Sequence, residues 1–162
     1  TAVSGSAYRG SNPCLPAKIF FSFDHFWPMT PDWHETELRV RYAETDQMGI
    51  VHHSNYIVWF EVARSDYCRT VGVPYTEMEA NDVQLIVAEV SLQYKRPAFY
   101  DDLLVVRVRA KEIRSRSLRF GYEVVRRSDS ELLATGETLH VVTDKSRNVR
   151  SLPLEYRKLF DA

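Results

Sequence analysis

The sequence predicts an α+β fold in which an antiparallel sheet curls round one long central helix. Three observations carry this prediction. A strand pattern comes first, one long apolar helix follows, and four further strand patterns joined by short connections come after the helix. Because short connections join antiparallel neighbours, we expect these strands to lie in one sheet.

The first strand is predicted over Thr36–Tyr42. Leu38, Val40 and Tyr42 fall on one side of it, and charged residues alternate with them on the other side. A period of two is typical of a strand with one buried face. The stretch Ala43–Ser54 that follows is polar, and we expect it to be a loop.

The long helix is predicted from Asn55 to about Val71. Ser54 or Asn55 can cap its start, and Gly72 is suited to its end. Residues 57–63 are apolar nearly all round the helix. We therefore expect the helix to be buried on most of its sides.

The remaining strands have clear alternation. They are predicted over Val83–Tyr94, Leu104–Lys111, Leu118–Arg126 and Leu132–Thr143. In the first of them, every second residue from Ile86 to Tyr94 is expected to face the same way. A last helical turn is expected over Leu154–Phe160.

Composition narrows the class of protein. The 162 residues suit one domain, and 44% hydrophobic with 27% charged residues is the profile of a soluble globular chain. A net charge of −1 argues against a protein that coats nucleic acid. No stretch is long and apolar enough to span a membrane, and no secretion signal is visible, so the cytoplasm is expected. Two cysteines exclude a disulfide scaffold and a structural zinc site, and Cys68 inside the helix is expected to be inert.

Residues 1–28 differ in composition from the rest. They join a Ser-, Gly- and Pro-rich stretch to an aromatic cluster, and Met29 is the first methionine. We predict an N-terminal extension without a catalytic role over 1–28 and one domain over 29–162. A sharper hypothesis is that Met29 is the natural start.

Titratable groups collect in the loop between the first strand and the helix. Backbone N–H groups at a helix N-terminus are unpaired and can polarise a carbonyl oxygen that gains negative charge. A carboxylate beside them can act as a general base or a nucleophile, and Asp46 is the candidate. The alternative for a single Asp in such a loop is a turn or capping residue.

A longer pattern resembles a known family. The residues that carry it are Tyr42-x-x-x-Asp46-x-x-Gly49-x-Val51-x-His53-x-x-Tyr56, then Glu61-x-Ala63-Arg64, then Tyr94-x-x-Pro97-Ala98-x-Tyr100-Asp101-Asp102, and Gly136-Glu137-Thr138. This pattern, over about Thr36 to Asp144, resembles the hotdog-fold acyl-CoA thioesterases related to 4-hydroxybenzoyl-CoA thioesterase. The resemblance implies hydrolysis of an acyl-CoA, aliphatic or aromatic, to a free acid and coenzyme A.

The resemblance also implies roles for single residues. Asp46 would attack the thioester or activate water, the His53 N–H would bond the thioester oxygen, and Tyr42 would face the site. Candidate substrate contacts are Gly49, Ile50, Val51, Asn55, Trp59, Arg114 and Arg116. Tyr42 can equally be a core residue. Glu61 and Arg64, three apart on the helix, favour a structural ion pair over a catalytic role for Glu61.

Charge along the chain supports a phosphate-bearing substrate. Residues 103–127 hold eight Lys and Arg against two Glu, and Arg forks suit the phosphates of coenzyme A. Arg114 and Arg116 lie at a connection between two strands, where they can reach a ligand. No metal or bound cofactor is expected. The resemblance implies a homo-oligomer, at least a dimer and by analogy a tetramer, with the site at a subunit interface.

Two other functions stay open at this level. One is a thioesterase that acts on an acyl carrier protein, for which the basic stretch offers a docking surface. The other is a non-catalytic module that binds acyl-CoA, against which Asp46, Gly49 and His53 argue.

Overall fold

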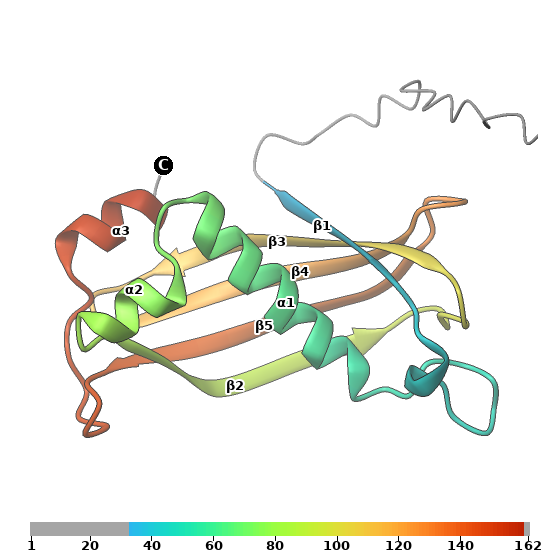
Figure 1. Ribbon diagram of the computed structural model, residues 1–162, viewed down its shortest axis with the longest axis horizontal. Coiled ribbons are helices and arrows are strands. Elements are labelled where there is room, and N and C mark those ends of the chain that lie inside the picture. The colour runs from blue at the N-terminus through green and yellow to red at the C-terminus, as the bar shows by residue number, and fades with distance from the viewer. Residues whose placement is uncertain (1–32, 161–162) are drawn as a thin grey trace, which may run out of the picture.

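The computed structural model describes residues 33–160. Their elements are β1 (His34–Arg39), the 3₁₀ turn η1 (Tyr42–Glu44), α1 (Asn55–Thr70), α2 (Tyr75–Ala80), β2 (Gln84–Tyr94), β3 (Leu103–Ile113), β4 (Ser117–Arg126), β5 (Leu132–Thr143) and α3 (Leu154–Phe160). The strands form one antiparallel sheet in the order β1-β3-β4-β5-β2, and α1 lies across one face of it (Figure 1). The predicted α+β architecture is confirmed. The predicted extension over 1–28 lies outside the described residues and stays a prediction.

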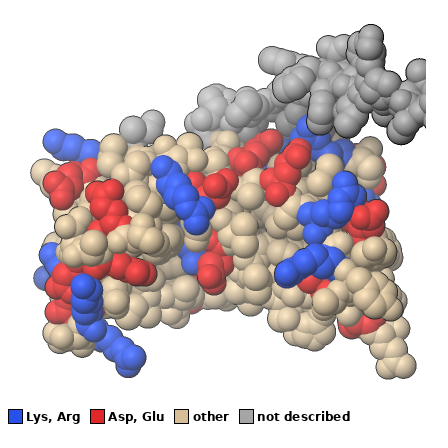
Figure 2. Space-filling view, viewed as in Figure 1, with Lys and Arg blue, Asp and Glu red and all other residues tan. Residues whose placement is uncertain are grey.

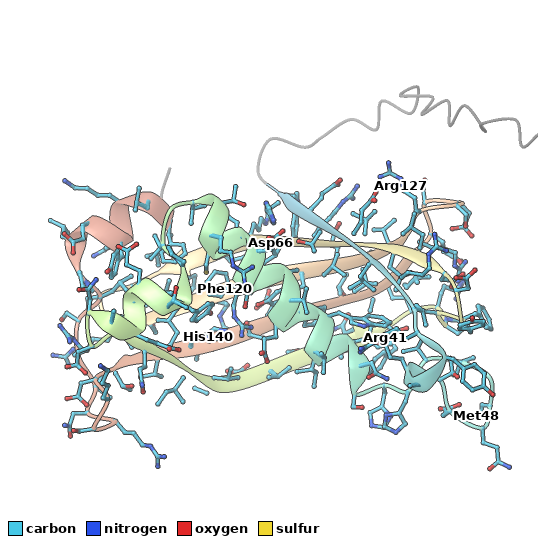
Figure 3. The ribbon with its side chains drawn as sticks, viewed as in Figure 1. Arg41, Met48, Asp66, Phe120, Arg127 and His140 are labelled. Atoms are coloured by element: carbon cyan, nitrogen blue, oxygen red, sulfur yellow. The ribbon has the colours of Figure 1, made fainter. Side chains whose placement is uncertain are left out.

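The core forms between α1 and the sheet, as the strand periodicity predicts. On β4, Leu118, Phe120, Tyr122 and Val124 are buried and point to the helix side. The Phe60 ring of α1 stacks on Tyr122 with the ring centroids 4.2 Å apart. The Phe120 ring packs edge-on against His140 of β5 with the ring centroids 5.3 Å apart, and both residues are labelled in Figure 3.

The alternation predicted for β2 is wrong in its first half. The register of β2 against β5 shifts between Val87 and Glu89 because a β-bulge inserts one residue there. A bulge exchanges the two faces, so Leu85 before it and Leu92 after it both pack on the core. Ile86 is left exposed.

The helix α1 has the predicted position but is not buried on most of its sides. Trp59, Phe60 and Ala63 are buried, whereas Ile57, Val58 and Val62 are each more than 40% exposed. Neighbouring apolar residues remain open on the β2 edge. Figure 2 shows uncharged surface along the lower margin of this face, where Figure 1 places β2. Within one subunit, the sheet therefore covers only one face of this apolar helix.

The helix ends differ in how well the sequence predicts them. Gly72, with φ of +83°, follows the C-terminus as expected for a residue that needs a left-handed backbone. At the N-terminus, Ser54 occupies the cap position without a side-chain hydrogen bond to the helix. The short helix α2 was missed, although Pro74 before it and an acidic residue in its first turn are start signals.

Candidate active site

Backbone hydrogen bonds hold the loop between β1 and α1 against the segment that follows β2. The Val51 N–H donates to the Ala98 carbonyl at 2.9 Å, and the Val40 N–H donates to the Asp102 carbonyl at 3.0 Å. Ile50 and Phe99 form an isolated β-bridge. The two motifs of the sequence pattern, far apart in the chain, therefore make one structure at one end of the sheet.

Glu44 anchors this loop to α1, and sequence reasoning missed it. Its buried carboxylate accepts hydrogen bonds from the Arg41 side chain at 2.9 Å and from the Trp59 indole at 3.1 Å. Burial alone raises the pKa of Glu44, but the bonds from Arg41 and Trp59 outweigh it and hold the pKa below its ordinary value. Its carbonyl accepts the His52 N–H and the Asn55 side-chain amide, both at 2.8 Å. A Glu in a polar stretch is expected to be exposed, so the burial of Glu44 could not be predicted from the sequence.

Asp46 closes a tight turn at the tip of the loop. Its Oδ1 accepts the Met48 N–H at 2.8 Å, and its carbonyl accepts the Gly49 N–H at 2.9 Å. Gly49 has a φ of +76°, which a residue with a side chain adopts only with strain. The other carboxylate oxygen has no hydrogen-bond partner between residues 33 and 160. Asp46 is thus a turn residue that also presents a free oxygen.

His53 lies just before the first turn of α1. No acceptor between residues 33 and 160 bonds its backbone N–H, while its carbonyl accepts the Tyr94 hydroxyl at 2.9 Å. Its ring lies against that of His52, with the centroids 4.1 Å apart. The open N–H at a helix N-terminus is a donor for a carbonyl oxygen that becomes negative.

A hollow of about 400 Å³ brings these groups together. It is lined by Asp46, Met48, Ile50, Val51, His53, Tyr56, Tyr94, Lys95, Arg96 and Pro97. Four of the sequence candidates therefore share one cavity, with a carboxylate and a helix N-terminus facing an aromatic and aliphatic wall. Met48 stands at the outer loop and is 76% exposed (Figure 3).

Six of the predicted site residues lie outside the hollow, and four of these belong to the loop and the start of α1. The strand β1 ends at Arg39, so Tyr42 does not share a face with Leu38, and it is 78% exposed with its ring 5.6 Å from that of Tyr100. Trp59 is buried beneath the loop on Glu44. Asn55 is likewise bonded to Glu44, and Gly49 shapes the turn without lining the cavity.

The predicted coenzyme contacts Arg114 and Arg116 lie at the far end of the sheet. They occupy the β3–β4 connection, next to the end of β5, whereas the hollow lies at the end where β2 and β4 finish (Figure 1). In one subunit they cannot share a site with Asp46. Lys95 and Arg96 are the cations that line the hollow, and sequence reasoning missed them because they lie outside the basic stretch.

The predicted ion pair between Glu61 and Arg64 is wrong. Arg64 turns away from the helix surface and donates to the hydroxyls of Tyr75 and Tyr122. Cys68 is buried, as predicted, and burial raises the pKa of its thiol to about 12. Within the described residues, no group of three or more His, Cys, Asp and Glu is placed to hold a metal ion. No helix among them is long and apolar enough to cross a membrane.

Comparison with known proteins decides the family. The model of the thioesterase-like superfamily matches residues 40–158, which span the loop, α1 and the whole of β2 to β5. The chain belongs to the thioesterase-like superfamily. The fold of this thioesterase is the hotdog fold that the resemblance implies.

Relatives and solved structures agree with this membership. YneP of Bacillus subtilis is 36% identical over 124 residues, which are 76% of this chain and 87% of that protein. The acyl-CoA thioester hydrolase YbgC of Escherichia coli is 31% identical over 117 residues, covering 72% of this chain and 87% of YbgC. The structure of a DHNA-CoA thioesterase from Staphylococcus aureus has a TM-score of 0.73 and 29% identity, covering 80% of this chain and 89% of that one.

Proposed function

We propose that this thioesterase hydrolyses acyl-CoA thioesters to a free acid and coenzyme A. The observation that carries the proposal is one hollow lined by both Asp46 and His53. Among residues 33–160, one Asp46 carboxylate oxygen and the His53 N–H at the helix N-terminus have no hydrogen-bond partner. The names of relatives such as YbgC support a coenzyme A thioester as substrate. Aliphatic and aromatic walls from Ile50, Val51 and Tyr56 suit an apolar acyl group.

The proposed reaction uses the chain's own groups and water. The thioester carbonyl oxygen accepts the His53 N–H, and the dipole of α1 favours the negative charge that develops there. Asp46 either attacks the carbonyl carbon, forming an anhydride that water opens, or removes a proton from the attacking water. In both routes the C–S bond breaks, the acid leaves with the oxygen of water, and the thiolate takes up a proton.

Coenzyme A is proposed to leave the hollow past Lys95 and Arg96. Arg96 is held by Glu131, with the Nε and the carboxylate 3.1 Å apart, and Lys95 makes no ion pair with residues 33–160. Lys95 is therefore the more available partner for a phosphate. Arg114 and Arg116 can join the same ligand only from another subunit.

A dimer is proposed to complete the site. Ile57, Val58 and Val62 of α1 are exposed, and so are Ile86, Val87 and Val90 of the edge strand β2. An apolar patch of this kind marks an interaction surface, and an unpaired edge strand can extend a sheet into a second copy. A tetramer stays a prediction from the resemblance.

The test of this function is thiol release from a panel of acyl-CoAs by wild type and Asp46→Asn. Asn keeps an oxygen that can accept the Met48 N–H, so the turn stays intact while the carboxylate chemistry is lost. We expect kcat to fall by roughly 10²–10⁴, with KM and the melting temperature little changed. Asp144→Asn is the matched control, because Asp144 also accepts a backbone N–H in a turn but lies at the other end of β5.

Each alternative function has its own outcome in this assay. A thioesterase for acyl carrier proteins would act much faster on the carrier-bound acyl group than on acyl-CoA. A binding module would bind acyl-CoA and hydrolyse neither substrate. Turnover of Asp46→Asn at the wild-type rate would remove Asp46 from the mechanism.

A further inference from the structure

Arg64, in the middle of α1, carries a charge that no carboxylate among residues 33–160 neutralises. The residue is 7% exposed. Its Nε donates to the Tyr75 hydroxyl at 2.8 Å and its Nη1 to the Tyr122 hydroxyl at 3.3 Å, and no acidic side chain between residues 33 and 160 pairs with it. A guanidinium is always charged in a protein, and a charge removed from water is costly unless an opposite charge accompanies it.

This buried cation opens into a hollow of its own. The hollow measures about 280 Å³ and lies between α1 and the start of α2. Asp46 lines a different hollow, at the N-terminal end of α1. Its lining is Glu61, Arg64, Ser65, Arg69, Pro74, Tyr75, Thr76 and Glu79. The Nη2 of Arg64 has no partner among the described residues, so it is the donor left for an occupant.

The lining indicates which anion fits. The flat, forked guanidinium matches a carboxylate, and the hydroxyls of Ser65 and Thr76 can add further hydrogen bonds. Glu61 of α1 and Glu79 of α2 also line the hollow, and their charges oppose an anion with two or more negative charges. The other cation of the lining, Arg69, pairs with Asp66. A singly charged carboxylate is therefore favoured over a phosphate.

We propose that this hollow is a carboxylate-binding site with Arg64 as its anchoring cation. The carboxylate is either that of a free acid or the Glu61 side chain of a second copy. Glu61 lies near the middle of α1, on the face that also exposes Val58 and Val62. When two copies place their sheets edge to edge with both helices on one side, the helices run antiparallel and each Glu61 comes opposite the other copy's Arg64.

The first experiment titrates sodium acetate and sodium butyrate into the full chain at constant ionic strength and follows the melting temperature. A saturable rise is expected, and inorganic phosphate should give a smaller one. Glu79→Gln removes a like charge from the wall and should tighten acetate binding about two- to fivefold. Glu77→Gln, which changes the same charge on α2 outside the hollow, should leave it unchanged.

Two further variants tie the response to the guanidinium. Arg64→Lys keeps the charge and loses the fork, so the acetate response should fall. Ser65→Glu places a tethered carboxylate in the hollow and should abolish the response in a chain that keeps Arg64. Ser65→Glu keeps the test valid where Arg64→Lys does not fold.

The second experiment distinguishes the source of the carboxylate. If Glu61 of a second copy fills the hollow, acetate has no effect, and Glu61→Gln weakens self-association at least tenfold in sedimentation while Glu77→Gln does not. An acetate-insensitive protein whose Glu61→Gln variant associates like wild type would overturn the proposal. Neither readout is activity, so this result is independent of the role of Asp46.

Discussion

Asp46 holds a turn, and the proposed reaction assigns the same side chain a catalytic role. One oxygen accepts the Met48 N–H, the other has no hydrogen-bond partner among residues 33–160, and the residue lines the hollow. The two interpretations that the sequence left open, capping residue and catalytic carboxylate, are therefore compatible. The turn fixes the backbone round this carboxylate, and Asp46 and His53 line the same hollow, as the proposed acyl transfer requires.

Gly136 of β5 is a second residue whose surroundings leave no room for a larger side chain. A Cβ at this position would lie 2.5 Å from Cε2 of Phe60 and 2.8 Å from the Ser91 carbonyl oxygen. We expect Gly136→Ala to lower the free energy of unfolding by about 1–3 kcal/mol, because a buried ring and a backbone must both shift. Urea denaturation would measure it.

Gly121 of β4 supplies the control for that prediction. A Cβ there would meet the Lys111 side chain at 2.6 Å, and that flexible, partly exposed chain can move aside. Gly121→Ala should therefore cost clearly less than Gly136→Ala. Equal losses would show that Phe60 and its surroundings adapt as easily as a surface lysine.

Among the elements, α1 has two apolar faces, one buried and one exposed, and its composition does not distinguish them. Trp59, Phe60 and Ala63 pack on the sheet, while Ile57 and Val62 stay open. Both faces are apolar, so the helical period alone could not indicate which face the sheet covers. The register of β2 has a similar cause, since a bulge is a property of strand pairing and leaves no mark in the alternation.

The open face of α1 leads to a prediction about assembly. Val62→Lys should weaken the proposed dimer at least tenfold, because it places a charge in the centre of the apolar face. The unfolding midpoint of the monomer should change little, since Val62 is 46% exposed. Analytical ultracentrifugation would measure the association.

Thr70→Lys is the matched control on the same helix. Thr70 is exposed at the last residue of α1, beyond the apolar face, so the same new charge should leave the dimer intact. A Val62→Lys variant that associates as tightly as wild type would place the interface elsewhere on the molecule.

At the scale of the whole molecule, a chain of buried polar groups links the helices to the sheet. Arg64 bonds Tyr122 at 3.3 Å, Tyr122 bonds Thr138 at 2.9 Å, and Thr138 bonds the Nε2 of His140 at 2.8 Å. Burial, with the charge of Arg64 nearby, lowers the pKa of His140 to about 4. The folded protein therefore holds this imidazole neutral.

This neutral histidine makes stability depend on pH. The folded pKa lies below the unfolded value of about 6.5, so between these values the unfolded chain binds the proton and the folded chain does not. Stability is full above pH 6.5 and should fall by about 3 kcal/mol as the pH drops to 4. Urea denaturation from pH 7 to pH 4 would measure the loss.

His140→Gln isolates the histidine from the other acid-sensitive groups. The paired carboxylates Glu44, Asp66 and Glu137 have lowered pKa values and also cost stability in acid, in wild type and variant alike. The wild type should therefore lose about 3 kcal/mol more than His140→Gln over this range. Identical pH profiles would mean that His140 binds a proton in the folded state.

The strands, α1 and the loop before α1 could be predicted from residues that are close together in the chain, whereas α2 could not. Alternation predicted the strands, one apolar run predicted α1, and the spacing from Asp46 to His53 predicted the loop at the helix N-terminus. These features depend on residues close together in the chain, whose geometry is set by the backbone period and by the special conformations of Gly49 and Gly72.

Contacts between residues far apart in the chain became visible only in the folded structure. The order β1-β3-β4-β5-β2 places Arg114 and Arg116 at one end of the sheet and Lys95 and Arg96 at the other, beside Asp46. It also gives Arg64 two tyrosine hydroxyls in place of Glu61. Such contacts follow from strand order and packing, and a pattern read along one chain contains neither.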